Sequence, residues 1–319
     1  MPMELSRTIG SIPASSTLAI SARAKAMKAE GADVVNFGVG EPDFDTPENI
    51  RTAGIEAINS GKTRYTPAAG MPELRAAVAN LYTNKYGVET APENVIVNSG
   101  AKSSLFLALG AMVNPGDEVI VPAPYWVSYP QIVIATGATP RIVETNESTG
   151  FKLTPEAFES AVGPKTKAIV LNSPSNPTGA VYTKDELSAL AEAIDEAGIY
   201  AISDEIYEYL VYGGAEHYCL TQVRPGLRDR AVIVSGASKT YAMTGWRIGY
   251  AVGPKELVTP MTRFQSHIMG NPCTISQAAT LEAITGDQSE VERMRGVFDE
   301  RRRHIVSAVA DIPNVSIHE

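Results

Sequence analysis

The chain has 319 residues, enough for one large hydrophobic core or two, and its 44% hydrophobic and 20% charged residues are ordinary for a globular protein. Its net charge of −9 argues against a nucleic-acid-binding surface, which needs a basic face. With two cysteines, no CxxC pair and four histidines, we expect neither a disulfide framework nor a metal site.

The sequence shows no targeting or membrane segment. The first twenty residues lack a continuous apolar stretch with a cleavage site, so we expect no signal peptide. No apolar run approaches the roughly 18 residues of a transmembrane helix. We therefore expect a soluble cytoplasmic protein from a reducing compartment.

Short apolar runs alternate with helical patterns along the chain. Each run is nearly continuous, which is typical of strands covered on both faces. The expected strands are Val95–Val97, Glu118–Val121, Ala168–Leu171, Ile199–Ile202 and Ala231–Val234. Strand–helix alternation of this kind predicts an α/β fold with a mostly parallel sheet.

One helix between these strands has clear start and stop signals. Thr183 and Glu186 form a capping-box pattern, after which leucine, alanine and isoleucine recur at helical spacing. Gly198 then ends the helix just before the fourth strand.

The most unusual polar and aromatic residues follow the strands directly. In chain order the segments after the five strands are NSGAK (98–102), PAPYW (122–126), NSPSNPTG (172–179), SDEIY (203–207) and SGASK (235–239). Because open α/β sheets bind ligands outside the carboxyl ends of parallel strands, we expect these five loops to form one composite site.

Taken singly, each residue of these loops also has an ordinary interpretation. Lys239 could be an exposed loop lysine, Asp204 a helix cap, Trp126 a core residue and Arg247 half of a surface ion pair. The small residues at 99–101 could present backbone N–H groups to a phosphate or could bind nothing. They do not match a P-loop, and Gly38-Val-Gly40 does not match the dinucleotide fingerprint.

Taken together, these residues match the needs of pyridoxal 5′-phosphate (PLP). That cofactor requires a lysine Schiff base, an acidic partner for its pyridinium nitrogen and an anchored phosphate. Lys239 supplies an amine, Asp204 a carboxylate, and Arg247 with the helix start after Gly100 suits a phosphate. Trp126 offers a flat surface for the ring.

The chain resembles fold-type I, class I and II aminotransferases over nearly its whole length, and most closely the bacterial and plastid aspartate and prephenate branch. The resemblance rests on motifs that occur in the family's order: GEPDFDTP (40–47), TRYTPAAG (63–70), SGAK (99–102), PAPYWVSYP (122–130), NSPSNPTGAVY (172–182), SDEIYE (203–208) and SKTYAMTGWRIGYAVGP (238–254). It implies a three-layer α/β/α large domain with a mostly parallel sheet, and a smaller α/β domain.

The resemblance also assigns roles in binding and using PLP. Lys239 is similar to the Schiff-base lysine that also moves the substrate's proton. Catalysis is expected to involve Asp204 at the ring nitrogen and Tyr207 at the phenolic oxygen, with Asn176 beside Tyr207 and Trp126 stacked on the ring. The positions that match the phosphate site are Ala101, Lys102, Ser238, Arg247 and Tyr65.

For the substrate, the resemblance implies acidic amino acids and their 2-oxo acids. Gly40 matches a glycine whose N–H meets the α-carboxylate, near Trp126 and Asn176, and Thr17 and Lys102 match groups that recognise a distal carboxylate. Aspartate or glutamate would donate an amino group to 2-oxoglutarate, oxaloacetate or prephenate in a ping-pong cycle. Because Tyr65 matches a residue that reaches the neighbouring subunit, we expect a homodimer with composite sites.

Two departures from the family pattern stand out. Position 236 is often serine in relatives but is Gly236 here, so one phosphate hydroxyl is either absent or replaced by Ser235. The family's C-terminal segment, with its arginine for the substrate α-carboxylate, would begin beyond Glu319, so we expect a partial or truncated sequence.

We expect an N-terminal arm with part of the small domain (1–45), a large domain (46–285) and the start of a C-terminal small domain (286–319). The alternatives to an aminotransferase are a PLP-dependent C–S lyase and a non-catalytic PLP-binding module.

Overall fold

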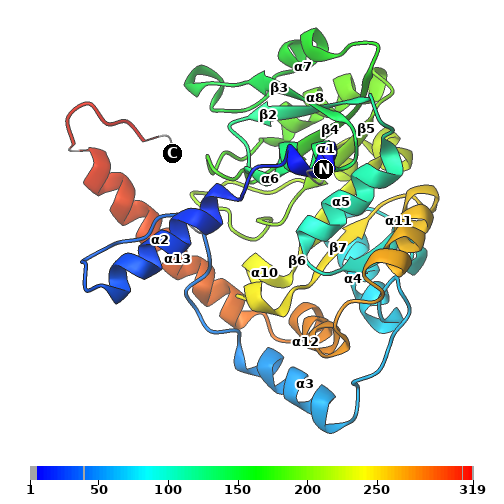
Figure 1. Cartoon of the computed structure of the whole chain (residues 1–319), viewed down its shortest axis with the longest axis vertical. Coiled ribbons are helices and arrows are strands. Elements are labelled where there is room, and N and C mark those ends of the chain that lie inside the picture. Colours follow the sequence, from blue (N-terminus) through cyan, green and yellow to red (C-terminus); the bar gives the residue numbers. More distant parts are fainter. Residues whose placement is uncertain (1–5, 39, 311, 318–319) are drawn as a thin grey trace, which may run out of the picture.

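The fold is built on a single seven-stranded sheet (Figure 1). The structure is a computed structural model and describes residues 6–38, 40–310 and 312–317. The strands are β1 (Val95–Asn98), β2 (Glu118–Ala123), β3 (Thr139–Glu144), β4 (Thr166–Asn172), β5 (Tyr200–Asp204), β6 (Ala231–Gly236) and β7 (Gly249–Val252). Their order in the sheet is β1-β7-β6-β5-β4-β2-β3.

The helices among the described residues are α1 (Arg7–Gly10), α2 (Ser16–Ala29), α3 (Glu48–Asn59), α4 (Pro72–Tyr86), α5 (Ala101–Met112), α6 (Ser128–Ala135), α7 (Pro155–Ala161), α8 (Lys184–Glu196), α9 (Leu220–Val223), α10 (Ala237–Thr240), α11 (Lys255–Ile268), α12 (Thr274–Thr285) and α13 (Ser289–Ala310). Four 3₁₀ turns accompany them: η1 (Pro92–Asn94), η2 (Glu147–Thr149), η3 (Pro225–Asp229) and η4 (Thr244–Trp246).

The five predicted strands are all present and all parallel. β7 is the exception, because it pairs antiparallel with both β1 and β6 and thereby leaves those two strands parallel to each other. Strands β6, β5, β4, β2 and β3 pair parallel in that order. Their carboxyl ends therefore meet at one edge of the sheet, which confirms the mostly parallel α/β fold expected from the sequence.

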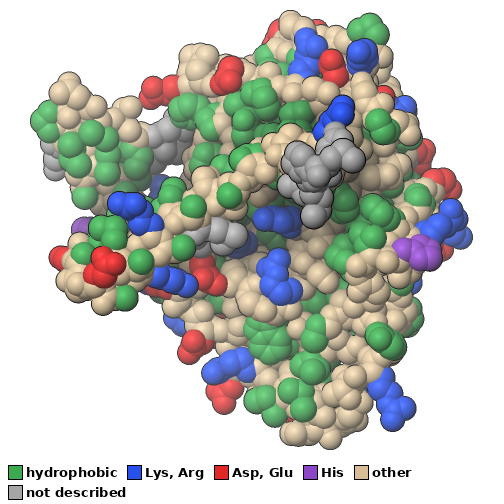
Figure 2. Space-filling model, viewed as in Figure 1, with side chains coloured by type: hydrophobic (Ala, Val, Ile, Leu, Met, Phe, Trp, Pro, Cys, Tyr) green, Lys and Arg blue, Asp and Glu red, His purple; other side chains and the backbone are tan. Residues whose placement is uncertain are grey.

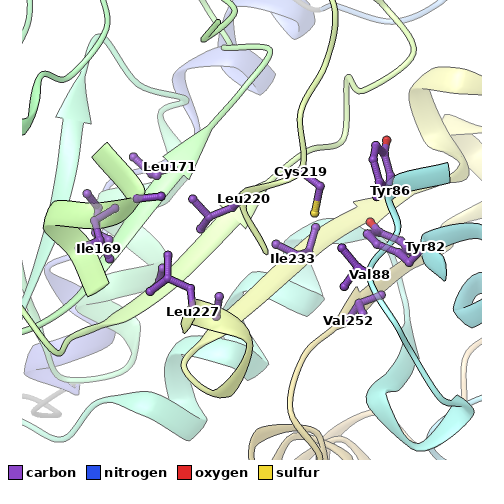
Figure 3. Packing of buried hydrophobic residues seen from close by; sticks show 14 of the residues in the cluster. Tyr82, Tyr86, Val88, Ile169, Leu171, Cys219, Leu220, Leu227, Ile233 and Val252 are labelled. Atoms are coloured by element: carbon purple, nitrogen blue, oxygen red, sulfur yellow. The ribbon is translucent and has the colours of Figure 1, made fainter. Parts of the chain in front are cut away.

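Alternate residues of each strand face two different cores, which makes the sheet the middle of three layers. On one face, Ile169, Leu171 and Ile233 pack against α4, α7, α8 and α9. Figure 3 shows Leu220 between Ile169 and Leu171 on one side and Ile233 on the other, with Cys219 and Tyr86 toward the far end of the cluster. Burying both faces in this way removes a large apolar area from water and dominates the stability of the domain.

The second face of the sheet packs against α5, α6 and α11. Val170, Ile202 and Val234 lie here among leucine, methionine and valine side chains of those helices. A third, smaller cluster joins α3, α10, α12 and the start of α13. This third cluster fixes α10, and with it Lys239, at the carboxyl edge of the sheet.

Local signals account for the element boundaries. The Thr183 hydroxyl caps the N–H of Glu186, whose carboxylate returns to the N–H of Thr183, as the capping-box pattern predicted. Gly198, at φ +67°, follows the end of α8 in the left-handed region that glycine adopts freely. Residues 1–5 and 39 of the predicted N-terminal arm and residues 311, 318 and 319 of the predicted C-terminal region lie outside the described residues.

Candidate functional site

The predicted loops do converge at the carboxyl edge of the sheet. β4 and β5 end side by side, with Asn172 paired to Asp204, and β6 continues the edge through the pairing of Asp204 with Val234. The helical turn α10, which carries Lys239, begins directly after β6. Figure 2 shows Lys and Arg side chains in a hollow near the middle of this face of the molecule, in the region of α10 in Figure 1.

Asp204 is a buried carboxylate whose partners are uncharged. Its Oδ2 accepts a hydrogen bond of 2.8 Å from the Tyr129 hydroxyl and its Oδ1 accepts one of 3.2 Å from the N–H of Ile206. Burial raises the pKa of Asp204 to about 6; these two hydrogen bonds oppose the shift and Glu205 adds to it. No ion pair to Asp204 exists among the described residues. A cation placed beside it would therefore be strongly stabilised.

Lys239 lies at the centre of the site. Its Nζ donates a 2.6 Å hydrogen bond to the carbonyl oxygen of Gly40 and lies 5.7 Å from the centre of the Tyr207 ring. Burial lowers the pKa of the amine; Glu41 opposes this shift and Arg247 adds to it. Because the neutral amine is the nucleophilic and proton-accepting form, this environment suits covalent chemistry at Lys239.

The start of α5 and Arg247 form an anion-binding corner. Arg247 stands in the left-handed region at φ +56°, and its Nη1 donates to the carbonyl oxygen of Thr244 at 2.9 Å. A Cβ added at Gly100 would lie 2.5 Å from Nη2 of Arg247. The guanidinium therefore lies against the first turn of α5, where the backbone N–H groups of Ala101 and Lys102 carry the positive end of the helix dipole.

Gly249 on β7 explains how the two parts of this corner approach each other so closely. A Cβ at this position would lie 2.3 Å from the backbone nitrogen of Ala101. Only a glycine lets β7 pass directly beneath the helix start. The missing side chain therefore shapes the anion site without contacting a ligand.

Trp126 and Lys102 flank the site on the side of α6. The Trp126 ring is half-buried and meets Tyr129 edge to face, with ring centres 5.4 Å apart. The Nζ of Lys102 lies 4.8 Å from the centre of the indole. Burial lowers the pKa of Lys102, and Arg247 lowers it further. The two cations thus share a region suited to anionic groups.

Tyr207 and Asn176 lie on adjacent loops, after β5 and β4. Burial raises the pKa of Tyr207 to about 12; Asp204 adds to the shift and a hydrogen bond with Asn176 opposes it. The N–H of Asn176 donates to Asn172 Oδ1 at 2.7 Å, which fixes the loop relative to the end of β4. The phenol of Tyr207 and the amide of Asn176 are therefore held together.

The structure shows why position 236 is a glycine. A Cβ at Gly236 would lie 2.8 Å from the Cα of Gly249, so a serine does not fit here without backbone movement. The hydroxyl of Ser235 donates to Glu208 Oε1 at 2.9 Å. Ser238 of α10 is also buried and directly precedes Lys239 in the chain.

Three predicted residues lie apart from this cluster or are joined to it only through the backbone. Gly40 contributes its carbonyl oxygen to Lys239. Thr17 lies on α2 and bonds to the hydroxyl of Ser15, and among the described residues no hydrogen bond joins it to Lys102. Tyr65 is 96% exposed on a loop.

Tyr129 is the site residue that sequence reasoning missed. It is buried, and it orients the Asp204 carboxylate through its hydroxyl. The signal was present, since Tyr129 lies three residues after Trp126, on the first turn of α6. A tyrosine inside an apolar helix is more often a core residue, so the pattern did not single it out.

A cleft borders the site. It measures about 580 Å³ and lies beside Tyr207, between the loop at 174–181 and α13. Its walls include Leu210, Tyr212 and the α13 residues Arg302 and Ile305. The cleft therefore separates the sheet domain from the C-terminal helix.

The residues present fit PLP by their chemistry. Asp204 is buried without a cation and can accept a protonated ring nitrogen, while Lys239 presents an amine. The close approach of Arg247 to the start of α5 provides donors for a phosphate. No cluster of His, Cys, Asp or Glu within residues 6–38, 40–310 and 312–317 could hold a metal ion, and no helix there is long and apolar enough to cross a membrane.

This combination of sheet, lysine and carboxylate is the arrangement of a transaminase. The sequence model of aminotransferase class I and II matches residues 32–318, and the chain belongs to that family. The family assignment made from the sequence motifs is thus confirmed.

Named relatives within the family are close. The chain is 46% identical to the aspartate aminotransferase of Geobacillus stearothermophilus over 311 residues, which are 98% of this chain and 79% of that enzyme. It is 46% identical over 313 residues to the aspartate/prephenate aminotransferase of Cereibacter sphaeroides, covering 98% of this chain and 78% of that one. The solved structure of Thermus thermophilus aspartate aminotransferase with maleate aligns with a TM-score of 0.95 at 43% identity, over 99% of this chain and 82% of the other.

Proposed function

We propose that this chain is a PLP-dependent aminotransferase that moves the amino group of aspartate or glutamate to a 2-oxo acid. The single observation that carries the cofactor assignment is Asp204, a buried carboxylate of raised pKa with no cationic partner among the described residues, at the same sheet edge as Lys239. The substrate class is supported by the names of the relatives, which are aspartate and aspartate/prephenate aminotransferases. The acceptors we propose are 2-oxoglutarate, oxaloacetate and prephenate.

When bound, PLP supplies an aldehyde that takes up the amino group and a ring that withdraws electrons from the substrate's α-carbon. Asp204 would keep a proton on the ring nitrogen, held in place by Tyr129. Arg247 and the N–H groups at the start of α5 would hold the phosphate, with Ser238 beside them. Asn176 and Tyr207 would hydrogen-bond the phenolic oxygen, and Trp126 would stack on the ring.

Lys239 has two tasks in this proposal. Its Nζ would bind the aldehyde of the cofactor and would carry a proton to and from the substrate's α-carbon. Both tasks need a neutral amine, and burial lowers the pKa in that direction. The hydrogen bond to the Gly40 carbonyl orients the amine toward the loop whose N–H we assign to the substrate α-carboxylate.

Lys102 is our choice for the distal carboxylate of an acidic substrate. It stands exposed at the start of α5, within reach of Trp126, and its positive field adds to that of Arg247. Thr17 would join it from α2 in the loaded enzyme. An acidic substrate gains more from this basic region than an aromatic one does.

We also propose a homodimer and a two-domain division. Tyr65 is 96% exposed although its ring is large and apolar, as expected of a residue that completes a partner's phosphate site. The cleft beside Tyr207 supports a boundary between the large domain (46–285) and a smaller unit made from 1–45 and 286–319. Sedimentation velocity of the PLP-loaded chain tests the dimer.

Absorbance spectroscopy of the full chain tests the function. With PLP, the wild-type protein should turn yellow, lose the visible band with glutamate or aspartate and regain it with 2-oxoglutarate. Borohydride reduction and peptide mapping should place the label on Lys239; a label elsewhere would overturn that role. Binding of PLP without any half-reaction on acidic amino acids would refute the aminotransferase proposal, and release of pyruvate and ammonia from a β-substituted amino acid would indicate a lyase.

A further inference from the structure

Glu208 is a buried charge in the turn that follows β5. Its side chain is only 1% exposed, and three side chains bond to it. The Nζ of Lys85 lies 3.0 Å from Oε2, the Tyr86 hydroxyl donates to the same oxygen, and the Ser235 hydroxyl donates to Oε1 at 2.9 Å. A buried carboxylate that meets this many donors is held rigidly, because breaking any one contact leaves a desolvated group.

The three partners of Glu208 come from two separate elements. Lys85 and Tyr86 are the last residues of α4, and Figure 3 shows Tyr86 at the end of the apolar cluster near Cys219. Ser235 lies on β6, one residue before Gly236 and four before Lys239. Glu208 itself follows Tyr207 directly. One side chain therefore ties the turn that carries Tyr207 to α4 and to the strand that leads into Lys239.

Glu208 and the proposed chemistry lie on opposite faces of the sheet. Asp204 alternates with Ser203 along β5, and its neighbour in register, Val234, belongs to the core under α5 and α6. Ser235 lies two residues after Ile233 on β6 and so shares its face, which belongs to the core under α4 and α8. The Glu208 contacts are thus made behind the sheet, where they can fix Asp204 and Tyr207 in place without touching a ligand.

The charge balance of this cluster also favours a permanent anion. Burial acts to raise the pKa of Glu208, but Lys85, His217 and the Tyr86 hydrogen bond outweigh it and lower the pKa below its ordinary value. Burial likewise acts against the charge of Lys85, yet Glu208 raises its pKa. Lys85 also lies 3.4 Å from the centre of the Tyr209 ring, which fixes the next residue of the same turn.

We propose that Glu208 is a positioning residue, which clamps the 204–209 turn to α4 and β6 so that Asp204, Tyr207 and Lys239 keep a common geometry. The catalytic part of this role rests on the proposed PLP function, whereas the structural part rests on the contacts of Glu208. If Glu208 were only part of a stabilising ion pair, its loss would lower the free energy of unfolding of the fold as a whole. If Glu208 is a clamp, its loss instead loosens two specific segments, 204–209 and 236–241.

The test compares Glu208→Gln with Asp195→Asn in the full chain. Glutamine keeps the shape and the Ser235 bond but loses the charge that holds Lys85. Asp195 is a matched control, because it is a partly buried carboxylate paired with Arg224 and Arg230. It lies away from the site, since Arg230 precedes the amino end of β6. Two readouts are measured for each variant: amide hydrogen exchange without cofactor, and the dissociation constant for PLP.

With Glu208→Gln, amides of 204–209 and 236–241 should exchange several-fold faster than in the wild type, and the dissociation constant for PLP should rise about tenfold, as expected when a buried pair is broken. Asp195→Asn should leave both readouts at the site unchanged while lowering stability. Equal exchange profiles for the two variants, or unchanged exchange in both segments of Glu208→Gln, would overturn the clamp.

Ser235→Ala decides the question if Glu208→Gln yields no folded protein. It removes the bond from Glu208 to β6, together with the hydrogen bond between Ser235 and Tyr250 on β7. Faster exchange in 236–241 supports the clamp, and unchanged exchange there overturns it. The exchange experiment needs no cofactor. A wild-type chain that takes up no PLP would therefore refute the proposed function, while the exchange data would still decide the role of Glu208.

Discussion

Replacing Asp204 by asparagine should stabilise the cofactor-free protein, although it removes the residue assigned to the ring nitrogen. The carboxylate is 3% exposed and its pKa is raised to about 6 from an ordinary value of 3.8. Keeping this carboxylate ionised therefore lowers the free energy of unfolding of the cofactor-free protein by about 3 kcal/mol at neutral pH, at 1.36 kcal/mol per pKa unit. An amide loses one of the two hydrogen bonds that Asp204 accepts, which costs about 1 kcal/mol. The net expectation is a gain of about 2 kcal/mol at pH 8.

The stability gained by Asp204→Asn should be larger at high pH than at low pH. Because the pKa is raised in the folded state, the folded protein binds more protons than the unfolded chain between pH 4 and pH 6. Wild-type stability contributed by Asp204 therefore falls as pH rises through that window and is constant above it. From the same two pKa values, the gain of Asp204→Asn should be about 1.4 kcal/mol smaller at pH 5 than at pH 8.

Urea unfolding of the cofactor-free variant and wild type at pH 5 and pH 8 measures both numbers. Asp195→Asn serves as the control and should destabilise at both pH values, because Asp195 has arginine partners. With saturating PLP the sign should reverse for Asp204→Asn, since breaking a buried charge pair costs about 3–5 kcal/mol. A variant less stable than wild type at pH 8 without cofactor, or a gain independent of pH, would refute the reasoning about Asp204.

Three further predictions concern the anion sites. Gly249→Ala should lower the free energy of unfolding in urea by about 1–3 kcal/mol, because its Cβ would collide with the nitrogen of Ala101; an unchanged midpoint would show that β7 and α5 can separate. Arg247→Ala should weaken PLP by about tenfold or more but pyridoxal very little in fluorescence titrations, because only PLP carries the phosphate; equal losses would contradict a phosphate contact. Lys102→Ala should lower kcat/KM for aspartate more than for phenylalanine, and equal effects would leave Lys102 a solvated lysine.

Most of the sheet could be predicted because burial on both faces leaves a mark in the sequence. The five expected strands are apolar without interruption, and each is present within one or two residues of its predicted bounds. β3 lacks this apolar run because most of the side chains of Thr139–Glu144 are exposed at one edge of the sheet, whereas β1 at the other edge is buried. β7 lacks it for another reason: Gly249–Val252 is short, begins with glycine and runs against the other strands.

The site could be predicted to the level of which loops converge, because parallel strands must end at one edge. Local sequence could not indicate close approaches between backbones. Gly236 and Gly249 are glycines because their Cα atoms face each other across β6 and β7, and nothing near either residue in the chain shows this. The same limit hid Tyr129, whose partner Asp204 lies 75 positions away.

Three carboxylates within five positions, Asp204, Glu205 and Glu208, show how the fold assigns different roles to similar residues. In sequence they form one acidic turn, and each could equally be a solvated surface charge. Strand alternation sends Glu205 to the α4 side, where it accepts bonds from Ser203, His217 and the N–H of Leu220.

Glu208 reaches the same side through the turn and meets Lys85, while Asp204 alone points to the face under α5 and α6. Among the described residues it is thus the carboxylate of the three that finds neither a lysine nor an imidazole, and its pKa rises while that of Glu208 falls. A cationic ring bound at this edge of the sheet would therefore select Asp204, because its two neighbours already have partners.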